Sequence, residues 1–401
     1  MSDQPAVRRR RVFYIPGYDP FHPRRYRELY RKEAALQAAV SGHEIALRPG
    51  GRDGRYGWHV DATIEGATGQ TEFEVLVWSD LVRSSMNPGI VQTYLLLIRT
   101  AWIYIASGAL WRLFRMRKGP VIAALYPVVF LLGQLLLALL AARLVGWGLS
   151  LVLPDWTAWA GLAVVPPILL WFKRHDNKVF AYYLMHDYAY SAAHRGANPP
   201  ELEGRMAEFT ATIRAALDED LDEVLIVGHS SGAHLGVSIL SDLLRGGALP
   251  ADAPALSFLS LGQVVPMVSF LPRADRLRAD LRFLSEQSQI PWVDVTAPGD
   301  GCAFALCDPV AVSGVATPAQ RWPLVLSAAF TKSLSPARWK ELRWRFFRLH
   351  FQYLCAFDRP RGYDYFAITA GGRTLGDRFA DRPPTPSRIA RPLSPYRSMA
   401  A

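Results

Sequence analysis

A long uncharged segment in the first half of the 401-residue chain constrains its fold most. From Val121 to Ala142 no residue is charged, and this run exceeds the roughly 20 apolar residues that a helix needs to cross a bilayer. A second uncharged run extends from Thr157 to Phe172. Helices of soluble proteins rarely run this far without a polar face, which disfavours the alternative of a buried helical pair in a soluble core. The sequence therefore predicts a transmembrane helical hairpin over residues 119–173.

The charges around this hairpin predict its orientation. The only charged residues in the connecting loop at 143–156 are Arg143 and Asp155. Seven basic residues, in contrast, flank the hairpin: Arg112, Arg115, Arg117, Lys118, Lys173, Arg174 and Lys178. Basic residues concentrate in cytoplasmic segments of membrane proteins. Both flanks are therefore expected in the cytoplasm and the loop on the opposite side. This pattern predicts an integral protein of the bacterial inner membrane whose remaining parts share the cytoplasmic side.

Residues 89–118, directly before the hairpin, are apolar but differ from a simple span. Tyrosine and tryptophan recur along this segment, and Arg99 interrupts its middle. These features favour an amphipathic helix that lies in the headgroup layer. A third span stays open as an alternative, although it would place residues 1–88 on the other side of the membrane from those that follow the hairpin.

Ser230 lies at the centre of a Gly-His-Ser-Ser-Gly motif that joins two different patterns. The apolar run 224–227 before it is typical of a buried strand, and residues 233–240 after it are typical of a helix. Small residues two positions before and after the serine allow a sharp turn from strand to helix that projects the hydroxyl outward. The context predicts a nucleophile elbow at Ser230, and the alternative is a Gly/Ser-rich turn that fits the motif by chance.

Chain order narrows the partners of such a nucleophile, because elbow-type sites supply serine, acid and histidine in that order. His350 is the one histidine of nine that follows both the motif and its helix. Asp300 is the favoured acid because it lies in a Pro/Gly turn directly after a short predicted strand. Asp308, in an Asp-Pro turn, remains the alternative, and Asp294 inside the strand suits the role less.

These segments together resemble the alpha/beta-hydrolase family, specifically its serine lipase and esterase branch. The resemblance covers residues 12–20, 224–240, 291–301 and 350. It implies an α/β fold with a doubly wound, mostly parallel sheet, here interrupted by the membrane hairpin, and acyl transfer through an acyl-serine. It also implies that the backbone N–H groups of Tyr18 and Ser231 form the oxyanion hole. An ordinary turn at 16–20 is the alternative for the first of these donors.

The sequence thus divides into five segments: 1–88 and 174–375, the two parts of a hydrolase domain; 89–118, the surface helix; 119–173, the hairpin; and 376–401, a disordered Arg/Pro-rich tail. The formal net charge of +10 next to a membrane span indicates attraction to anionic lipid headgroups rather than nucleic-acid binding. Three cysteines show no metal-ligand spacing, and no cofactor is expected. The oligomeric state stays open.

The expected function is that of a membrane-anchored serine hydrolase, a lipase or esterase acting on an ester or thioester of an apolar acyl chain. The expected partners are this lipid or acyl-ester substrate and the bilayer itself. Two alternatives stay open. One is a non-enzymatic membrane scaffold that keeps the hydrolase fold, and the other is an acyltransferase that passes the acyl group to an acceptor other than water.

Overall fold

A mixed eight-stranded sheet forms the centre of the protein in a computed structural model, which describes residues 7–52, 54–86, 89–250 and 252–400. The strand order is β2-β3-β4-β1-β5-β6-β7-β8. Neighbours from β4 to β8 are parallel, whereas β2, β3 and β4 pair as an antiparallel meander. The predicted α/β class is confirmed. The strands are β1 (Arg9–Ile15), β2 (Glu44–Pro49), β3 (Gly57–Ile64), β4 (Ala67–Val75), β5 (Glu223–His229), β6 (Ala255–Leu261), β7 (Trp292–Thr296) and β8 (Leu324–Ser327).

Helices cover both faces of this sheet. Successive residues of β1 point to opposite faces, so that Val12 and Tyr14 enter one hydrophobic core and Phe13 and Ile15 the other. One core packs against α1 (Arg24–Ser41), α13 (Phe330–Ser333), α14 (Pro336–Leu342) and α16 (Tyr365–Ala370). The other packs against α8 (Pro200–Ala216), α9 (Gly232–Arg245) and α11 (Asp275–Glu286). Because both faces are buried, the central strands read as continuous apolar runs in the sequence.

Shorter elements complete the body. They are α2 (Ser79–Ser85), α7 (Ala181–Ala193), α10 (Val265–Ser269), α12 (Pro309–Val312), α15 (Phe346–His350), α17 (Leu375–Phe379), and the 3-10 turns η2 (Asp176–Lys178) and η3 (Phe351–Leu354).

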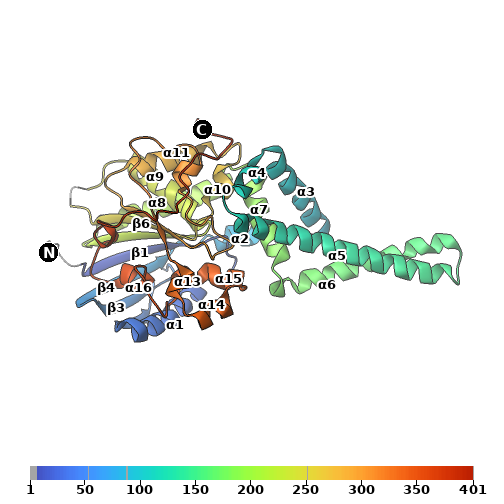
Figure 1. The fold of residues 1–401 in the computed structure, drawn as a ribbon, viewed down its shortest axis with the longest axis horizontal. Coiled ribbons are helices and arrows are strands. Elements are labelled where there is room, and N and C mark those ends of the chain that lie inside the picture. The colour runs from blue at the N-terminus through green and yellow to red at the C-terminus, as the bar shows by residue number, and fades with distance from the viewer. Residues whose placement is uncertain (1–6, 53, 87–88, 251, 401) are drawn as a thin grey trace.

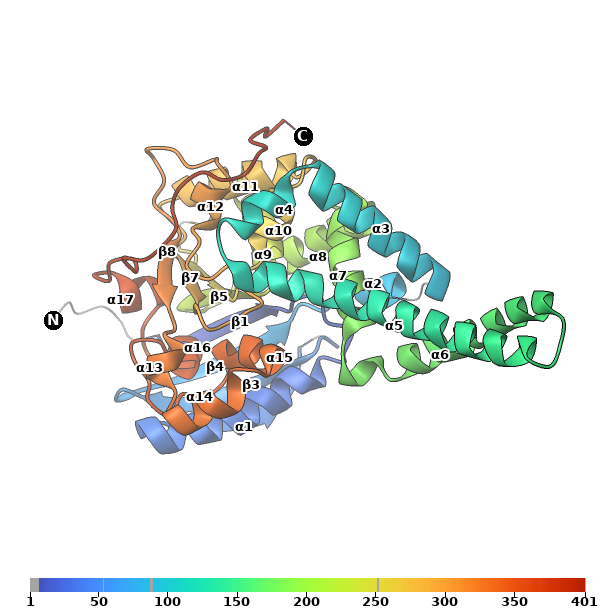
Figure 2. The same cartoon turned by 45° about the vertical axis from the view of Figure 1, so that its right-hand side comes forward.

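Two apolar helical segments project from the body as a hairpin (Figures 1 and 2). The first is α5 (Lys118–Ser150), and the second joins η1 (Asp155–Val164) to α6 (Val165–Arg174). Each is long and apolar enough to cross a membrane by length and composition. The predicted loop at 143–156 is wrong in its bounds, because residues 143–150 continue α5 and a four-residue turn remains.

The predicted surface helix at 89–118 is two helices, α3 (Ile90–Ala106) and α4 (Ala109–Phe114). Gly108 separates them with a left-handed φ of 72°, a conformation that glycine adopts without strain. One side of α3 packs through Leu97 against Tyr182 and Met185 of α7. Its other side exposes large apolar residues: Val91, Leu95, Ile98, Trp102 and Ile105.

The tail at 376–401 differs from the disorder that its composition predicts. Its described part lies along the body and forms backbone hydrogen bonds with it. The Thr385 N–H donates to the Val325 carbonyl over 2.9 Å, and the Ser394 N–H donates to the Val312 carbonyl over 2.9 Å. Ile389 and Leu393 pack against a small hydrophobic core. Composition misses this order because the apolar residues that anchor the tail are few and widely spaced.

Candidate active site

Ser230 occupies a sharp turn between β5 and α9, with a left-handed φ of 57°. A non-glycine residue held in this region stores strain of about 1–3 kcal/mol, which the surroundings must impose. Two glycines allow the turn. A β-carbon on Gly228 would lie 2.6 Å from the Gly232 carbonyl oxygen, and one on Gly232 would lie 2.1 Å from the Ile15 carbonyl oxygen. The motif spacing therefore reflects close backbone packing around the serine.

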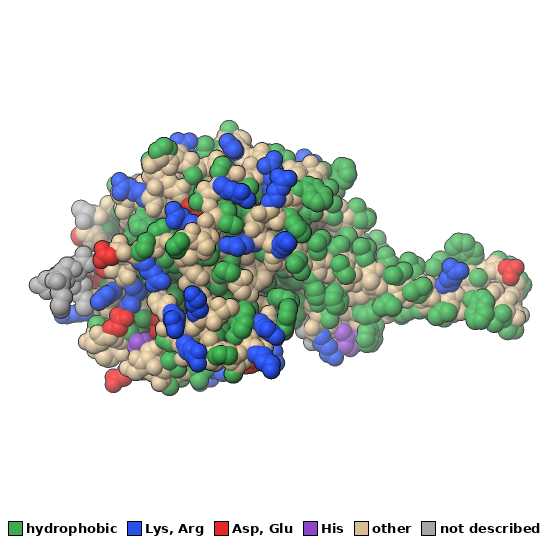
Figure 3. Space-filling view, in the orientation of Figure 1, with side chains coloured by type: hydrophobic (Ala, Val, Ile, Leu, Met, Phe, Trp, Pro, Cys, Tyr) green, Lys and Arg blue, Asp and Glu red, His purple; other side chains and the backbone are tan. Residues whose placement is uncertain are grey.

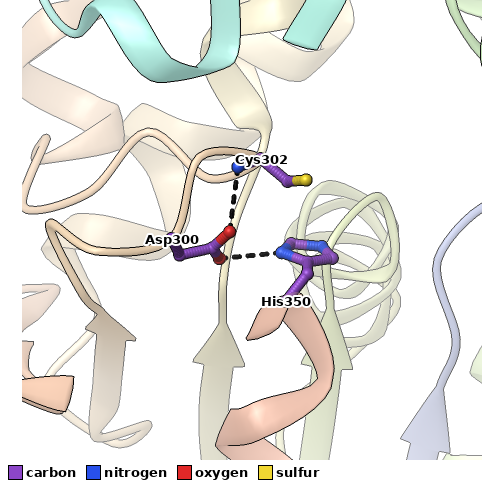
Figure 4. Close-up of side chains that lie close together, drawn as sticks. All are labelled: Asp300, Cys302 and His350. Atoms are coloured by element: carbon purple, nitrogen blue, oxygen red, sulfur yellow. Dashed lines mark hydrogen bonds and ion pairs between the residues drawn. The ribbon is translucent and has the colours of Figure 1, made fainter. Parts of the chain in front are cut away.

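The structure brings Asp300 and His350 together. The His350 Nδ1 and an Asp300 carboxylate oxygen are 2.8 Å apart (Figure 4). The same carboxylate accepts the Cys302 backbone N–H at 2.8 Å and the Tyr353 hydroxyl at 3.0 Å. Burial alone would raise the pKa of Asp300, but the charge of His350 and these donors bring that pKa below its usual value. Asp300 is thus held as a carboxylate that accepts a hydrogen bond from the His350 Nδ1–H.

His350 lies beside the turn that carries Ser230. A β-carbon on Gly262 would lie 3.1 Å from His350 Cε1. The preceding residue, Leu261, accepts the Ser230 backbone N–H at 2.9 Å. Among the described residues, His350 Nε2 is buried and forms no hydrogen bond. This ring nitrogen therefore belongs to a residue beside the serine turn, and it is not bonded to the serine hydroxyl.

His229, inside the serine motif, supports the backbone of His350. Its Nε2 is 3.0 Å from the His350 carbonyl oxygen, and the two rings lie 4.8 Å apart. Burial, together with the nearby His350 charge, lowers the pKa of His229 to about 3. The ring stays neutral at physiological pH and donates its Nε2 proton to that carbonyl. This contact ties the histidine segment to the elbow, although sequence reasoning gave His229 no role.

The loop after β1 packs directly on the elbow. A β-carbon on Gly17 would lie 2.9 Å from Ser230 Cβ, so only glycine fits this approach. The next residue, Tyr18, is fixed from two sides: its hydroxyl lies 2.6 Å from Ser85 Oγ, and its carbonyl accepts a hydrogen bond from the Tyr183 hydroxyl. Within the described part of the chain, neither the Tyr18 nor the Ser231 backbone N–H donates to another residue. Both groups flank Ser230.

The other two acidic candidates, Asp308 and Asp294, form hydrogen bonds that stabilise the fold. Asp308 caps α12, where its carboxylate accepts the Val310 and Ala311 N–H groups at 3.0 Å each. Asp294 lies buried within β7 and accepts the Ser260 hydroxyl at 2.6 Å. Burial raises the pKa of Asp294 to about 8. Neither carboxylate forms the contact with His350 that Asp300 makes.

Sequence reasoning missed Asp187 and Cys302. Asp187 is half-buried on α7, where burial raises its pKa to about 7 and the His350 charge opposes that rise. Cys302 lies next to the acid and histidine, and potential ligand atoms of Asp300, Cys302 and His350 fall within 4.8 Å of one another, a set that could hold a metal ion. Burial raises the pKa of the Cys302 thiol, which disfavours a metal-binding thiolate. No ligand spacing could signal either residue, because the site joins distant segments.

Comparison with protein families, with curated proteins and with solved structures gives no match for this chain.

Proposed function

We propose that the protein is a membrane-anchored serine hydrolase of the alpha/beta-hydrolase type that cleaves an ester or thioester of an apolar acyl chain. One observation carries the proposal. Ser230 has a positive φ at the carboxyl end of a parallel strand, beside a histidine whose Nδ1 is bonded to a buried carboxylate. A strained, half-buried serine beside a histidine with an unpartnered ring nitrogen is the arrangement that acyl transfer requires.

In the proposed reaction, Ser230 Oγ attacks the acyl carbonyl carbon while His350 Nε2 takes the hydroxyl proton. His350 then gives that proton to the leaving alcohol or thiol as its bond to the acyl carbon breaks. Water repeats the sequence on the acyl-serine, and the free acid leaves with the serine restored. Asp300 holds the imidazole tautomer and stabilises the imidazolium. The Tyr18 and Ser231 N–H groups stabilise the oxyanion, and one such donor contributes about 3–4 kcal/mol to the transition state.

The membrane part of the proposal rests on the two apolar segments and their basic flanks. α5 and the segment Asp155–Arg174 carry the hydropathy of membrane spans. Strands from before and after the hairpin pair directly in one sheet, β1 with β5, so both flanks must share a compartment. We place that compartment on the cytoplasmic side because the basic residues lie on the flanks.

Labelling with a fluorophosphonate probe tests the proposal. Detergent-solubilised wild type should label, and Ser230→Ala should not. The matched control is Ser231→Ala, which removes the adjacent hydroxyl but keeps the backbone N–H, and which should still label. Turnover of a long-chain nitrophenyl ester should follow the same pattern, with loss of several orders of magnitude in Ser230→Ala. A wild type that neither labels nor turns over would favour the scaffold, and ester turnover only with an added alcohol acceptor would favour the acyltransferase.

A further inference from the structure

An unusual surface segment leads into the helix that carries His350. Residues 343–348, here called the arginine–aromatic segment, read Arg-Trp-Arg-Phe-Phe-Arg. The Trp344 side chain is 71% exposed and Phe346 is 47% exposed. The segment's three arginines are also exposed, and Arg345 and Arg348 share a single carboxylate partner, Glu341, at 3.5 and 3.4 Å. Apolar patches rimmed by charged side chains often mark surfaces that contact a membrane or a protein.

This segment lies at the foot of the hairpin. The Phe347 ring packs 4.9 Å from the Phe180 ring and 5.9 Å from the Tyr183 ring. Phe180 directly precedes α7, which follows α6 after a short turn. Figures 1 and 2 both place α15 beside the base of the hairpin, and Figure 3 shows basic side chains gathered on this part of the body. A membrane that holds the hairpin would therefore begin next to the segment.

The same segment contacts the loop that carries the candidate acid. A β-carbon on Gly301 would lie 3.2 Å from the Phe346 ring, and Gly301 directly follows Asp300. A β-carbon on Gly119, in the first turn of α5, would lie 3.2 Å from Gly301 Cα. The Asp300 loop is thus held between the start of the hairpin and the arginine–aromatic segment. Movement of Phe346 would disturb both Asp300 and His350, which ends α15.

We propose that the arginine–aromatic segment binds an anionic lipid surface, and that this contact holds the Asp300–His350 pair in place. Tryptophan favours the headgroup level of a bilayer, and arginine is attracted to anionic headgroups. Continuity with the hairpin foot favours a bilayer over a peptide or nucleic acid as the partner. The coupling to activity rests on the proposed hydrolase function, whereas the lipid contact does not. It follows that hydrolysis should be faster in an anionic bilayer than in a neutral one.

The lipid contact is tested without reference to activity. The full chain carrying Trp344→Cys, labelled with an environment-sensitive fluorophore, is placed in nanodiscs of phosphatidylcholine with or without phosphatidylglycerol. Spin-labelled headgroups should quench the fluorophore, and more strongly when phosphatidylglycerol is present. A fluorophore at Arg9→Cys serves as the control, because β1 begins on the side of the body away from the hairpin. Equal quenching at both positions, or none at position 344, would overturn the lipid contact.

The coupling is tested by ester hydrolysis in the same nanodiscs. Phosphatidylglycerol should raise the hydrolysis rate of wild type. In the variant Arg345→Gln/Arg348→Gln this rate enhancement should be smaller by about tenfold or more. The matched control is Arg9→Gln/Arg48→Gln, which removes two equally exposed arginines that pair with Asp220 and Asp61. An equal loss in both variants would show an effect of net charge alone and overturn the coupling. Quenching without any Ser230-dependent hydrolysis would reject the hydrolase proposal while leaving the lipid contact in place.

Discussion

At the scale of single residues, the candidate site depends on glycines, because no side chain would fit at their positions. Three backbone segments meet at Ser230, and a β-carbon on Gly17, Gly228 or Gly232 would overlap a neighbouring segment. This crowding imposes the positive φ of the serine. Strain of this kind persists only where the surrounding structure enforces it, and it concentrates at functional sites. The same crowding brings the Tyr18 loop to the serine.

Asp300 and Asp308 differ in what they contact, and this difference gives the first prediction. Asp300→Asn should lower kcat roughly a thousandfold or more, because an amide cannot stabilise the imidazolium and favours the wrong tautomer of His350. Asp308→Asn should leave kcat near the wild-type value, since asparagine caps a helix as well as aspartate does. Steady-state kinetics on a soluble ester measures both. The reverse ranking would transfer the acid role to Asp308.

Asp294 gives a prediction for the pH dependence of stability. Burial raises its pKa in the folded protein to about 8, above the value of an unfolded aspartate, so folding takes up a proton. The resulting contribution to stability is present below the unfolded pKa and is lost as pH rises toward 8. Asparagine does not ionise, so the Asp294→Asn variant does not lose stability in this way as the pH rises. The Tm of this variant relative to wild type should therefore increase between about pH 5 and about pH 9. A difference that stays constant with pH would contradict the raised pKa.

At the scale of elements, the sequence predicts those helices and strands whose pattern is set by local chemistry. Strand β5 and helix α9 follow from an apolar run and a helical pattern that local chemistry sets. The turn at Ser230 follows from its glycines. By contrast, the end of α5 could not be located, because residues 143–150 suit a helix or a loop until they pack on η1. Asp187 was invisible for a similar reason, since only tertiary folding places α7 near His350.

The packing of the hairpin gives a prediction for its two nearby glycines. A β-carbon on Gly146 would lie 2.3 Å from the Ala158 carbonyl oxygen, whereas one on Gly148 would contact nothing within 4 Å. Gly146→Ala should therefore force α5 and η1 apart and lower the Tm in detergent. Gly148→Ala should leave the Tm unchanged or raise it, because alanine favours a helix by about 1 kcal/mol over glycine. Equal Tm values for the two variants would mean that close packing does not stabilise the hairpin.

At the scale of the whole molecule, the hairpin is inserted between strands that pair with each other. β1 and β4 precede the insertion and β5 follows it, and all three lie side by side in the sheet. α5 contains 33 residues and is about 50 Å long, which exceeds the roughly 30 Å apolar thickness of a bilayer. Its first turns are partly buried against the body, for example at Val121. The remaining length suffices to cross a membrane while the sheet stays entirely on one side.

The proposed topology can be tested by cysteine accessibility in intact cells. The turn between α5 and η1 should face away from the cytoplasm, and Val152 in that turn is 86% exposed. Val152→Cys should react with an impermeant thiol reagent added from outside, whereas Ser398→Cys, on the body, should react only after the cells are opened. Wild type is the background control, because its three cysteines are buried or half-buried. Reaction of Ser398→Cys from outside would place the sheet and its candidate site on the outer face, and would exclude hydrolysis of a cytoplasmic substrate.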